Sequence, residues 1–378
     1  MSEKRIDIDH TRKLGFGLMR LPKKLLAIDI EQTKKMVDMF MEAGFTYFDT
    51  AHVYPGSEDA ARQALTERYS RDSYTIATKL FVQAALTEDM AKKQFYTSMK
   101  RMKIDYIDYY LLHCIMEKKK KKYDKFNIWE FAAEQKRKGN IRYMGFSFHS
   151  GPALLDKLLT EHPDVDFVQL QLNYADWENP RVTSRANYEV ARRHGKRIVV
   201  MEPVKGGALA NPSREIKELF TGYSPTMSPS SWAIRFAASL EGILTVLSGM
   251  SNVNQMEDNL SYMQDFHPLN KEEQDIIHKA QKILGSSKTI PCTACRYCTD
   301  GCPQQIAIPD IFSAMNKRIG SGQIEQSVED YRRLTQHSGK AADCIECGQC
   351  EGVCPQHIGI IEQLKECSKV FDDSHPNS

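Results

Sequence analysis

The sequence contains no apolar run approaching the roughly 18 residues that a membrane-spanning helix needs. It begins MSEKRIDIDHTRK, which has no apolar stretch of the kind that marks a secretory signal, so we expect a cytoplasmic protein. A charge surplus is also missing, because 51 Lys and Arg are balanced by 49 Asp and Glu. We therefore expect neither a nucleic acid nor a membrane surface as a partner.

Cysteine is nearly absent from most of the chain. Of the ten cysteines, Cys114 stands alone and the other nine lie between Cys292 and Cys367. Disulfide frameworks are typical of small secreted proteins, and a chain of 378 residues without a secretory signal does not fit that class. Clustered cysteines in an intracellular protein indicate a metal site instead.

A glycine-rich dinucleotide fingerprint is missing as well. No G-x-G-x-x-G follows the first expected strand, which argues against a doubly wound nucleotide-binding sheet. Short β-rich runs alternate with helical runs, which is typical of βα units. The expected strands are Leu14–Met19, Tyr47–Asp49, Tyr74–Lys79, Tyr106–His113, Arg142–Ser147, Phe167–Asn173, Ile198–Glu202 and Thr245–Ser248. Eight such units match a (β/α)8 TIM barrel, so we predict an α/β fold of this class.

A second, smaller domain is expected after the barrel. A helical run over Glu272–Leu284 ends at Gly285, and glycine is the usual residue just past a helix. Ser286–Lys288 then has the composition of a linker. We place the boundary there, with the barrel over residues 1–285 and a small, cysteine-rich α-helical domain over residues 286–378.

The cysteine-rich domain repeats one motif. C-x2-C-x2-C-x3-C-P occurs at residues 292–303 and again at 344–355, which is the spacing of bacterial two-cluster ferredoxins. Three cysteines bind three corners of a cubane, and the fourth points toward the other cluster. We therefore assign two [4Fe–4S] clusters, one to Cys292, Cys295, Cys298 and Cys354 and the other to Cys302, Cys344, Cys347 and Cys350. Zinc sites also use C-x2-C pairs, but a zinc site does not require four closely spaced cysteines followed by proline, and this chain has that motif twice.

Chemically useful side chains stand at the ends of three expected strands. Asp49, Lys79 and His113 end the second, third and fourth strands, and Tyr54 follows five residues after Asp49. The carboxyl ends of TIM-barrel strands converge on the active-site face. A tyrosine phenol with a pKa of about 10 is a poor acid at neutral pH, but a nearby ammonium lowers that pKa. Such a set would serve as a general acid and base for reducing a carbonyl or oxidising an alcohol.

Several stretches of the barrel half match a known family. They are GFGLMRLP (15–22), FDTAHVYPGSE (48–58), TIATK (75–79), DYYLLH (108–113), GFSFH (145–149), VQLQLNY (168–174), MEPVKGG (201–207) and GMSNVNQMEDNL (249–260). The sequence resembles the aldo-keto reductases, and more narrowly the bacterial members that append a two-cluster ferredoxin-type domain. The resemblance implies that Asp49, Tyr54, Lys79 and His113 form a catalytic tetrad, with Tyr54 as the general acid.

The resemblance also implies a nicotinamide cofactor, NADPH or NADH, bound in extended form across the barrel mouth. Ser147 and Gln169 would hold the nicotinamide carboxamide, with Asn173 nearby. The segment that begins at Gly249 would hold the adenosine end, with Asn259 near the adenine.

The chain departs from the family at a few positions. Members that prefer NADP have a basic residue where this chain has Gln255, and glutamine supplies no charge for the 2′-phosphate. Lys205 is a basic residue that could compensate. Phe148 replaces the asparagine that often follows Ser147 in the family, which removes one polar contact to the cofactor, and the N-terminal hairpin is shortened or remodelled. The sequence therefore leaves NADH and NADPH both open.

Three functions remain open at this point. The first is an NAD(P)-dependent oxidoreductase that interconverts a small-molecule carbonyl and an alcohol, with clusters that support or regulate the fold. The second is an electron-transfer oxidoreductase whose clusters serve a ferredoxin- or flavodoxin-type partner or a bound flavin, and the third is an interaction module. Lys118–Lys122, after the fourth strand, is either a solvated loop or a docking site for such an acidic partner.

Overall fold

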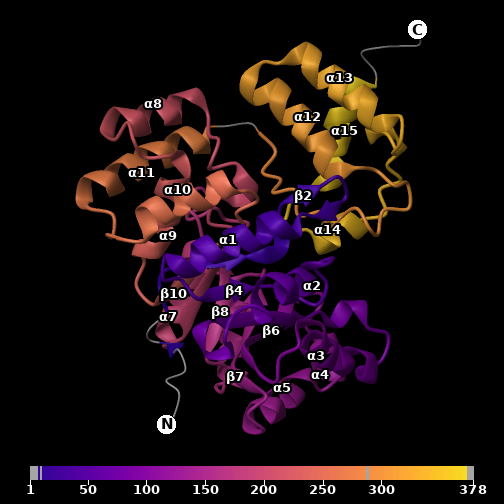
Figure 1. Ribbon diagram of the computed structural model, residues 1–378. Coiled ribbons are helices and arrows are strands. Elements are labelled where there is room, and N and C mark those ends of the chain that lie inside the picture. The colour runs from indigo at the N-terminus through magenta and orange to yellow at the C-terminus, as the bar shows by residue number, and fades with distance from the viewer. Residues whose placement is uncertain (1–6, 9–10, 287–288, 373–378) are drawn as a thin grey trace. The chain divides into compact units, whose positions relative to one another are not determined.

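A computed structural model describes residues 7–8, 11–286 and 289–372 (Figure 1). Its internal contacts divide the chain into a barrel unit, Met1–Val204 with Ser230–Gln274, and a cysteine unit, Lys205–Pro229 with Asp275–Ser378. Residues 205–229 thus group with the cysteines rather than with the strand that precedes them. The boundary near residue 285 stays a prediction, and Ser287 and Lys288 of its linker lie outside the described residues.

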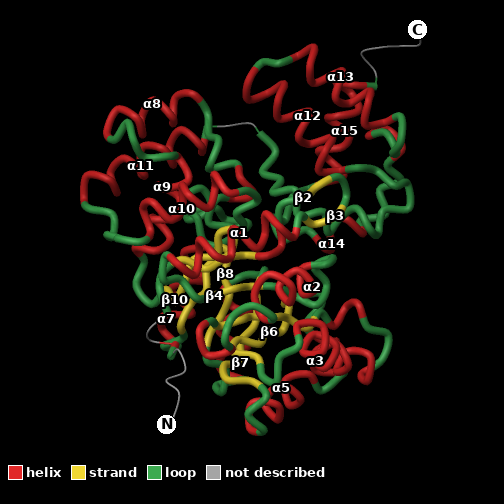
Figure 2. Tube along the Cα trace, in the orientation of Figure 1, coloured by secondary structure: helices red, strands yellow, loops and turns green. Residues whose placement is uncertain are grey.

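Eight parallel strands close into a barrel in the first unit. Their order around the barrel is β1-β10-β9-β8-β7-β6-β5-β4. The strands are β1 (Leu14–Gly17), β4 (Tyr47–Asp49), β5 (Thr75–Leu80), β6 (Ile107–Ile115), β7 (Ile141–Phe148), β8 (Phe167–Gln171), β9 (Arg197–Met201) and β10 (Ile243–Ser248). Figure 2 shows these strands gathered together, with helices outside them. The predicted TIM barrel is therefore confirmed.

Helices cover the outside of the barrel. They are α1 (Ile30–Glu42), α2 (Ser57–Ala61), α3 (Glu88–Met102), α4 (Lys121–Lys125), α5 (Ile128–Arg137), α6 (Pro152–Glu161), α7 (Ser184–Arg193), α9 (Pro229–Ser239), α10 (Val253–Met263) and the first turn of α11 (Lys271–Gly285). Within the described residues, no helix has the length and apolarity needed to cross a membrane.

Helix α1 shows how the sequence positions these helices. Asp29 precedes the helix and accepts a hydrogen bond from the backbone nitrogen of Gln32 at 3.0 Å, which satisfies one free amide of the first turn. Met36 and Phe40 recur at helical spacing and are fully buried. The ring of Phe40 lies 5.2 Å from that of Phe48 on β4. The apolar stripe of α1 therefore holds the helix against the barrel wall.

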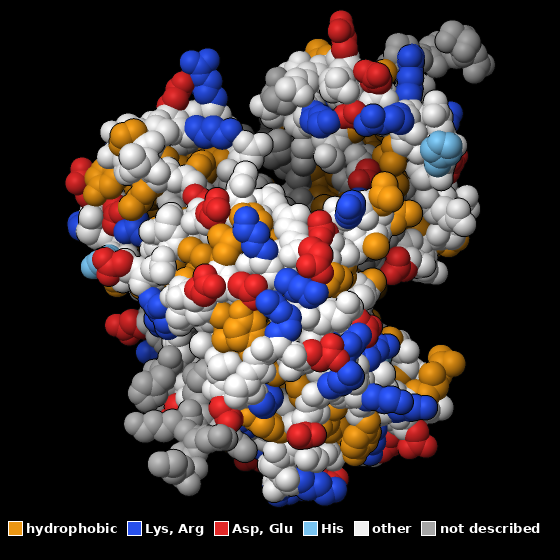
Figure 3. All heavy atoms as spheres, viewed as in Figure 1, with side chains coloured by type: hydrophobic (Ala, Val, Ile, Leu, Met, Phe, Trp, Pro, Cys, Tyr) orange, Lys and Arg blue, Asp and Glu red, His pale blue; other side chains and the backbone are white. Residues whose placement is uncertain are grey.

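A two-stranded hairpin, β2 (Lys23–Lys24) with β3 (Ala27–Ile28), follows β1. The predicted change in the family's N-terminal hairpin falls partly on residues 1–6 and 9–10, which lie outside the described residues. Acidic and basic side chains are interspersed on the face shown in Figure 3, as the balanced composition leads us to expect.

The register of the parallel strands brings their carboxyl ends to one rim. Lys79 pairs with Leu111, two residues before His113, and Ser147 pairs with Gln169 on the neighbouring strand. Every residue of β5, β6 and β8 is buried. Polar side chains at the ends of these strands are therefore held at the rim by apolar residues below them.

The cysteine unit is helical, as the sequence predicts. Its helices are α8 (Arg214–Tyr223), the rest of α11, α12 (Ile308–Ser321), α13 (Ile324–Thr335), α14 (Gln349–Val353) and α15 (Ile360–Phe371). Ile311, Phe312 and Leu364 form a buried core with Cys367, which is fully buried. Cys367 therefore behaves as an apolar core residue.

Candidate functional site

A buried ion pair lies at the rim of the barrel. Asp49 ends β4 and Lys79 lies on β5, and the Lys79 Nζ donates to Asp49 Oδ1 at 2.5 Å. The same ammonium donates to the carbonyl oxygen of Thr50 at 2.7 Å. Lys79 is 1% exposed and Asp49 is 4% exposed. A charged pair this deep in the protein is retained only where its charges are mutually compensated.

Tyr54 and His113 stand beside this pair. The Lys79 Nζ lies 5.1 Å from the centre of the Tyr54 ring, and the Tyr54 ring lies edge-on to His113 with 5.6 Å between ring centres. The structure thus brings together all four residues of the predicted tetrad, Asp49 included. Tyr54 is half-buried, whereas the other three are buried. Its phenol is therefore the member of the set that a small molecule can reach.

Burial and charge act in opposite directions on the ion pair. Burial lowers the pKa of Lys79, and the carboxylate of Asp49 opposes that change. Burial also raises the pKa of Asp49, against the charge of Lys79 and the hydrogen-bonding side chain of Gln169. The carboxylate of Asp49 therefore keeps Lys79 charged, although the buried surroundings of Lys79 disfavour that charge.

His113 is held neutral by its surroundings. Burial, with smaller contributions from Lys79, His149 and Lys119, lowers the pKa of His113 well below its usual range. Its Nδ1 is buried and has no hydrogen-bond partner among the described residues. A neutral imidazole can donate or accept a hydrogen bond, which fits the task of orienting a polar ligand group.

The loop that carries Tyr54 is anchored by Glu58, which is only 2% exposed. Its Oε1 accepts from Thr78 Oγ1 at 2.8 Å, and its Oε2 accepts from Arg101 Nη1 at 3.1 Å. Gly56, two residues earlier, has a φ of +71°, which glycine adopts without strain. No role for Glu58 or Arg101 is predicted from the sequence, although Glu58 ends the matched stretch FDTAHVYPGSE.

Two of the predicted carboxamide-binding residues lie at the same rim. Ser147 on β7 is 1% exposed, and its Oγ accepts from the backbone nitrogen of Cys114 at 2.7 Å. Gln169 on β8 is 2% exposed and lies close enough to Asp49 to lower the pKa of that carboxyl group. Both side chains retain hydrogen-bonding capacity beyond these contacts.

Asn173 is occupied by other protein groups. Its Nδ2 donates to Asp176 Oδ2 at 2.9 Å and to the carbonyl oxygen of Glu202 at 3.1 Å, and its Oδ1 accepts from the backbone nitrogen of Asp176. These bonds connect the segments that follow β8 and β9. The geometry therefore gives Asn173 a bracing position, and its contact with a cofactor stays a prediction.

The segment after β10 presents a buried acceptor. Asn259 on α10 is 4% exposed, and its Oδ1 has no hydrogen-bond partner in the described part of the chain. Gln255 Oε1 instead accepts from the backbone nitrogen of Ser251 at 2.7 Å, close to the start of the segment at the exposed Gly249. Asn259 is thus the better placed of the two amides for an incoming hydrogen-bond donor.

The segment after β9 has an unusual backbone. Glu202, Lys205, Gly206 and Gly207 all have φ values between 48° and 101°. A Cβ on Gly206 would fall 2.5 Å from the carbonyl oxygen of Thr293, a distance that no side chain tolerates. Lys205 and Gly206 therefore belong to a turn that packs closely against the residue next to Cys292.

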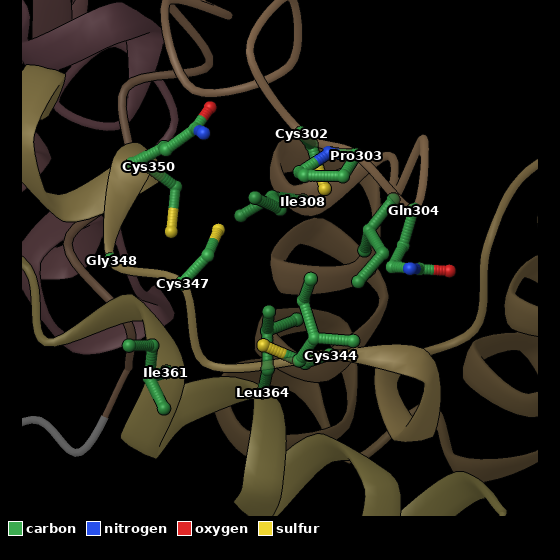
Figure 4. A pocket seen from close by; sticks show the side chains of 13 residues that line it. Cys302, Pro303, Gln304, Ile308, Cys344, Cys347, Gly348, Cys350, Ile361 and Leu364 are labelled. Carbon is green, nitrogen blue, oxygen red and sulfur yellow. The ribbon is translucent and has the colours of Figure 1, made fainter.

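The cysteines of the second unit line two cavities. The first is lined by Cys292, Cys295, Cys298 and Cys354, and the second by Cys302, Cys344, Cys347 and Cys350. In both cavities the fourth cysteine comes from the other motif, and Figure 4 shows the second set around its cavity. Among the described residues, no three His, Cys, Asp or Glu side chains converge on a point suited to a single metal ion. Each set supplies the four thiols that a [4Fe–4S] cluster requires, and the presence of two clusters stays a prediction.

Two sequence families match different parts of the chain. Residues 13–282 match the model of the aldo/keto reductase family, and residues 291–359 match that of the 4Fe-4S dicluster domain. Aldo-keto reductase str7 of Strobilurus tenacellus is 30% identical over 52% of this chain and 59% of its own length. The NAD(P)H-dependent 6′-deoxychalcone synthase of Glycine max is 26% identical over 48% of this chain and 61% of its own. The chain thus spans about three fifths of the length of these curated relatives.

Solved structures with the same barrel include an aldo-keto reductase from Bacillus halodurans in its holo form. It has a TM-score of 0.57 and 25% identity, and the match covers 71% of this chain and 91% of that one. An aldo/keto reductase from Klebsiella pneumoniae, in complex with NADP and acetate, has a TM-score of 0.59 at 16% identity. That match covers 74% of this chain and 96% of the other, and it supports the fold alone.

We expect His113 to make stability fall in mild acid. Folded His113 stays neutral, whereas this histidine in the unfolded chain binds a proton with a pKa of about 6.5. The contribution of His113 to the free energy of unfolding is therefore complete above that pH and declines below it. Between pH 7 and pH 5.5 the free energy of unfolding of the wild type should fall by about 1 kcal/mol more than that of His113→Gln. Urea unfolding at both pH values measures this difference. The exposed His278 provides the control His278→Gln, and a full wild-type loss in His113→Gln would contradict the prediction.

Proposed function

Because the chain belongs to the aldo/keto reductase family, we propose that it is an NAD(P)-dependent oxidoreductase that interconverts a carbonyl and an alcohol by hydride transfer. The observation that carries this proposal is the half-buried Tyr54 beside the Asp49–Lys79 ion pair, with the Lys79 Nζ 5.1 Å from its ring centre. A phenol next to a buried ammonium is a suitable proton donor for a developing alkoxide.

The chain's own groups divide the work of carbonyl reduction. NAD(P)H, when bound, would supply the hydride for the carbonyl carbon. Tyr54 donates its phenolic proton to the carbonyl oxygen, and Lys79 stabilises the tyrosinate that remains. Asp49 keeps Lys79 charged and in place, while neutral His113 orients the carbonyl. In alcohol oxidation the same groups act in reverse, and the tyrosinate accepts the proton.

The residues present fit a nicotinamide dinucleotide. Ser147 and Gln169 offer polar groups at the rim for the carboxamide, and the unpartnered Oδ1 of Asn259 is an acceptor for an adenine amine. Relatives named above use NAD(P)H or hold NADP. Gln255 carries no charge for a 2′-phosphate, so the proposal covers both NADPH and NADH. Lys205 is the basic residue that the sequence offers as a replacement for that charge.

The cysteine unit fits two [4Fe–4S] clusters, one in each four-cysteine cavity. The clusters, when bound, store one electron each. A hydride carries two electrons, and the barrel has no second organic cofactor site assigned to it. We therefore propose that carbonyl reduction does not depend on the clusters. The proposed substrate is a small molecule, and the proposed location of the protein is the cytoplasm.

An electron-transfer role is the second candidate. It is favoured by one observation, since Cys347 is exposed whereas Cys298, Cys350 and Cys354 are buried. The cluster beside Cys347 would be within reach of an external donor or acceptor such as a ferredoxin or flavodoxin.

Tyr54→Phe should lower kcat for aldehyde reduction by about 10²- to 10⁴-fold, because it removes the transferable proton and keeps the ring. Stopped-flow measurement of NAD(P)H oxidation with an added aldehyde tests this. Tyr96→Phe, at a tyrosine that is 53% exposed on α3, is the matched control and should retain wild-type kcat. Equal loss in both variants would show that the effect is not specific to the site.

The shared cavities predict how cysteine variants group. Anaerobically purified protein should hold about eight iron atoms per chain, and Cys350→Ala or Cys302→Ala should each leave about four. Both variants should show the same residual electron paramagnetic resonance spectrum, and Cys298→Ala and Cys354→Ala should share a different one. Cys114→Ala, at a cysteine outside both cavities, should keep all the iron. A residual spectrum in Cys302→Ala that matches Cys298→Ala would overturn the crossed assignment.

Anaerobic mixing separates the two candidate functions. Oxidised protein is mixed with NADH or NADPH and an aldehyde, while cluster colour and nicotinamide absorbance are recorded together. We expect nicotinamide to be consumed with the cluster band unchanged, because the barrel holds every group that the reaction needs. Bleaching of the band in step with nicotinamide oxidation would instead establish electron transfer between the two units.

A further inference from the structure

One lysine of the Lys118–Lys122 run faces the candidate active site. The Nζ of Lys119 lies 5.8 Å from the centre of the Phe81 ring. That ring in turn lies edge-on to His113, with 5.5 Å between ring centres. A single aromatic ring therefore separates the ammonium from the imidazole of the tetrad.

The position of Lys119 is fixed by contacts of its own loop. The buried hydroxyl of Tyr123 donates to the carbonyl oxygen of His113, which ties the loop to the end of β6. Gln83 Nε2 donates to the carbonyl oxygen of Lys119 at 3.1 Å, and the backbone nitrogen of Lys122 also donates to it. The loop is therefore anchored at Lys119 itself and again at Tyr123.

The charge of Lys119 has no counterion in the described part of the chain, whereas its neighbour Lys120 pairs with Glu117 at 2.8 Å. Lys119 is half-buried, while Lys118 and Lys121 are exposed. Its charge also reaches the site, since it contributes to the lowered pKa of His113. A partly desolvated ammonium without a counterion favours the entry of an anion.

The barrel topology indicates which molecule brings that anion. The lysine loop follows β6, whereas the proposed adenosine segment follows β10, and three strands separate β6 from β10 in either direction around the barrel. The two segments therefore lie on opposite sides of the rim. An anion at Lys119 belongs to the substrate rather than to the phosphates of the cofactor.

We infer that Lys119 binds an anionic group, a carboxylate or a phosphate, of the carbonyl substrate, and that Phe81 contacts the part between that group and the carbonyl. This inference rests on the proposed reductase function and specifies its substrate class. In the reaction the carbonyl carbon gains the hydride and its oxygen gains the proton of Tyr54. The anionic group keeps its charge throughout, so its contact with Lys119 serves binding and orientation.

The test compares anionic aldehydes with neutral counterparts. The first pair is 4-carboxybenzaldehyde and methyl 4-formylbenzoate, and the second is glyceraldehyde 3-phosphate and glyceraldehyde, which separates carboxylate from phosphate recognition. For wild type we expect a higher kcat/KM with the anionic member of at least one pair. Lys119→Gln should lower that preference about tenfold, mainly through KM, as expected for loss of one charge-assisted contact.

Lys121→Gln is the matched control, because it removes the same charge from an exposed position of the same run. It should change the preference by less than about twofold, since an exposed charge is screened by solvent. Equal effects of Lys119→Gln on both members of each pair would overturn the inference, as would equal effects of the two lysine variants. Absence of NAD(P)H oxidation with any of the four aldehydes would instead overturn the reductase function itself.

Discussion

The candidate site depends on one buried ion pair, between Lys79 and Asp49. Each charge would be costly alone at this depth, and each is stabilised by the other across 2.5 Å. The other features of the proposed catalytic site follow from this arrangement. The ammonium provides the field beside Tyr54, and it helps to keep His113 neutral. Loss of either partner would leave a buried charge uncompensated and change both neighbours together.

The barrel supplies the geometry that the ion pair needs. Parallel register places the ends of β4, β5 and β6 side by side, so residues far apart in sequence meet without long loops. Tyr54 is the exception, because it lies on a loop and needs its own anchor. Glu58 provides that anchor through Thr78 and Arg101. Rigid strands thus hold the ion pair, and a braced loop brings Tyr54, the proposed proton donor, to it.

The strands, and the proximity of the four residues of the proposed tetrad, were predictable because periodicity, strand ends and motif all pointed to the same positions. The crossed grouping of Cys302 and Cys354 followed from the cubane geometry behind the motif. Other features depend on tertiary contacts that leave no local pattern. Nothing in the sequence around Asn173 shows that Asp176 and Glu202 occupy its amide. Equally, five consecutive lysines look alike until the fold turns one of them toward Phe81.

The close contact between Gly206 and Thr293 bears on how such a protein can be assembled in evolution. Residues 205–229 follow β9 in sequence but group with the cysteine unit, and the turn at Gly206 leaves no room for a side chain there. The cysteine unit therefore includes a segment of chain that lies well before the predicted boundary near residue 285. A gene fusion that joined it to another barrel would also need a glycine-bearing turn after the seventh barrel strand.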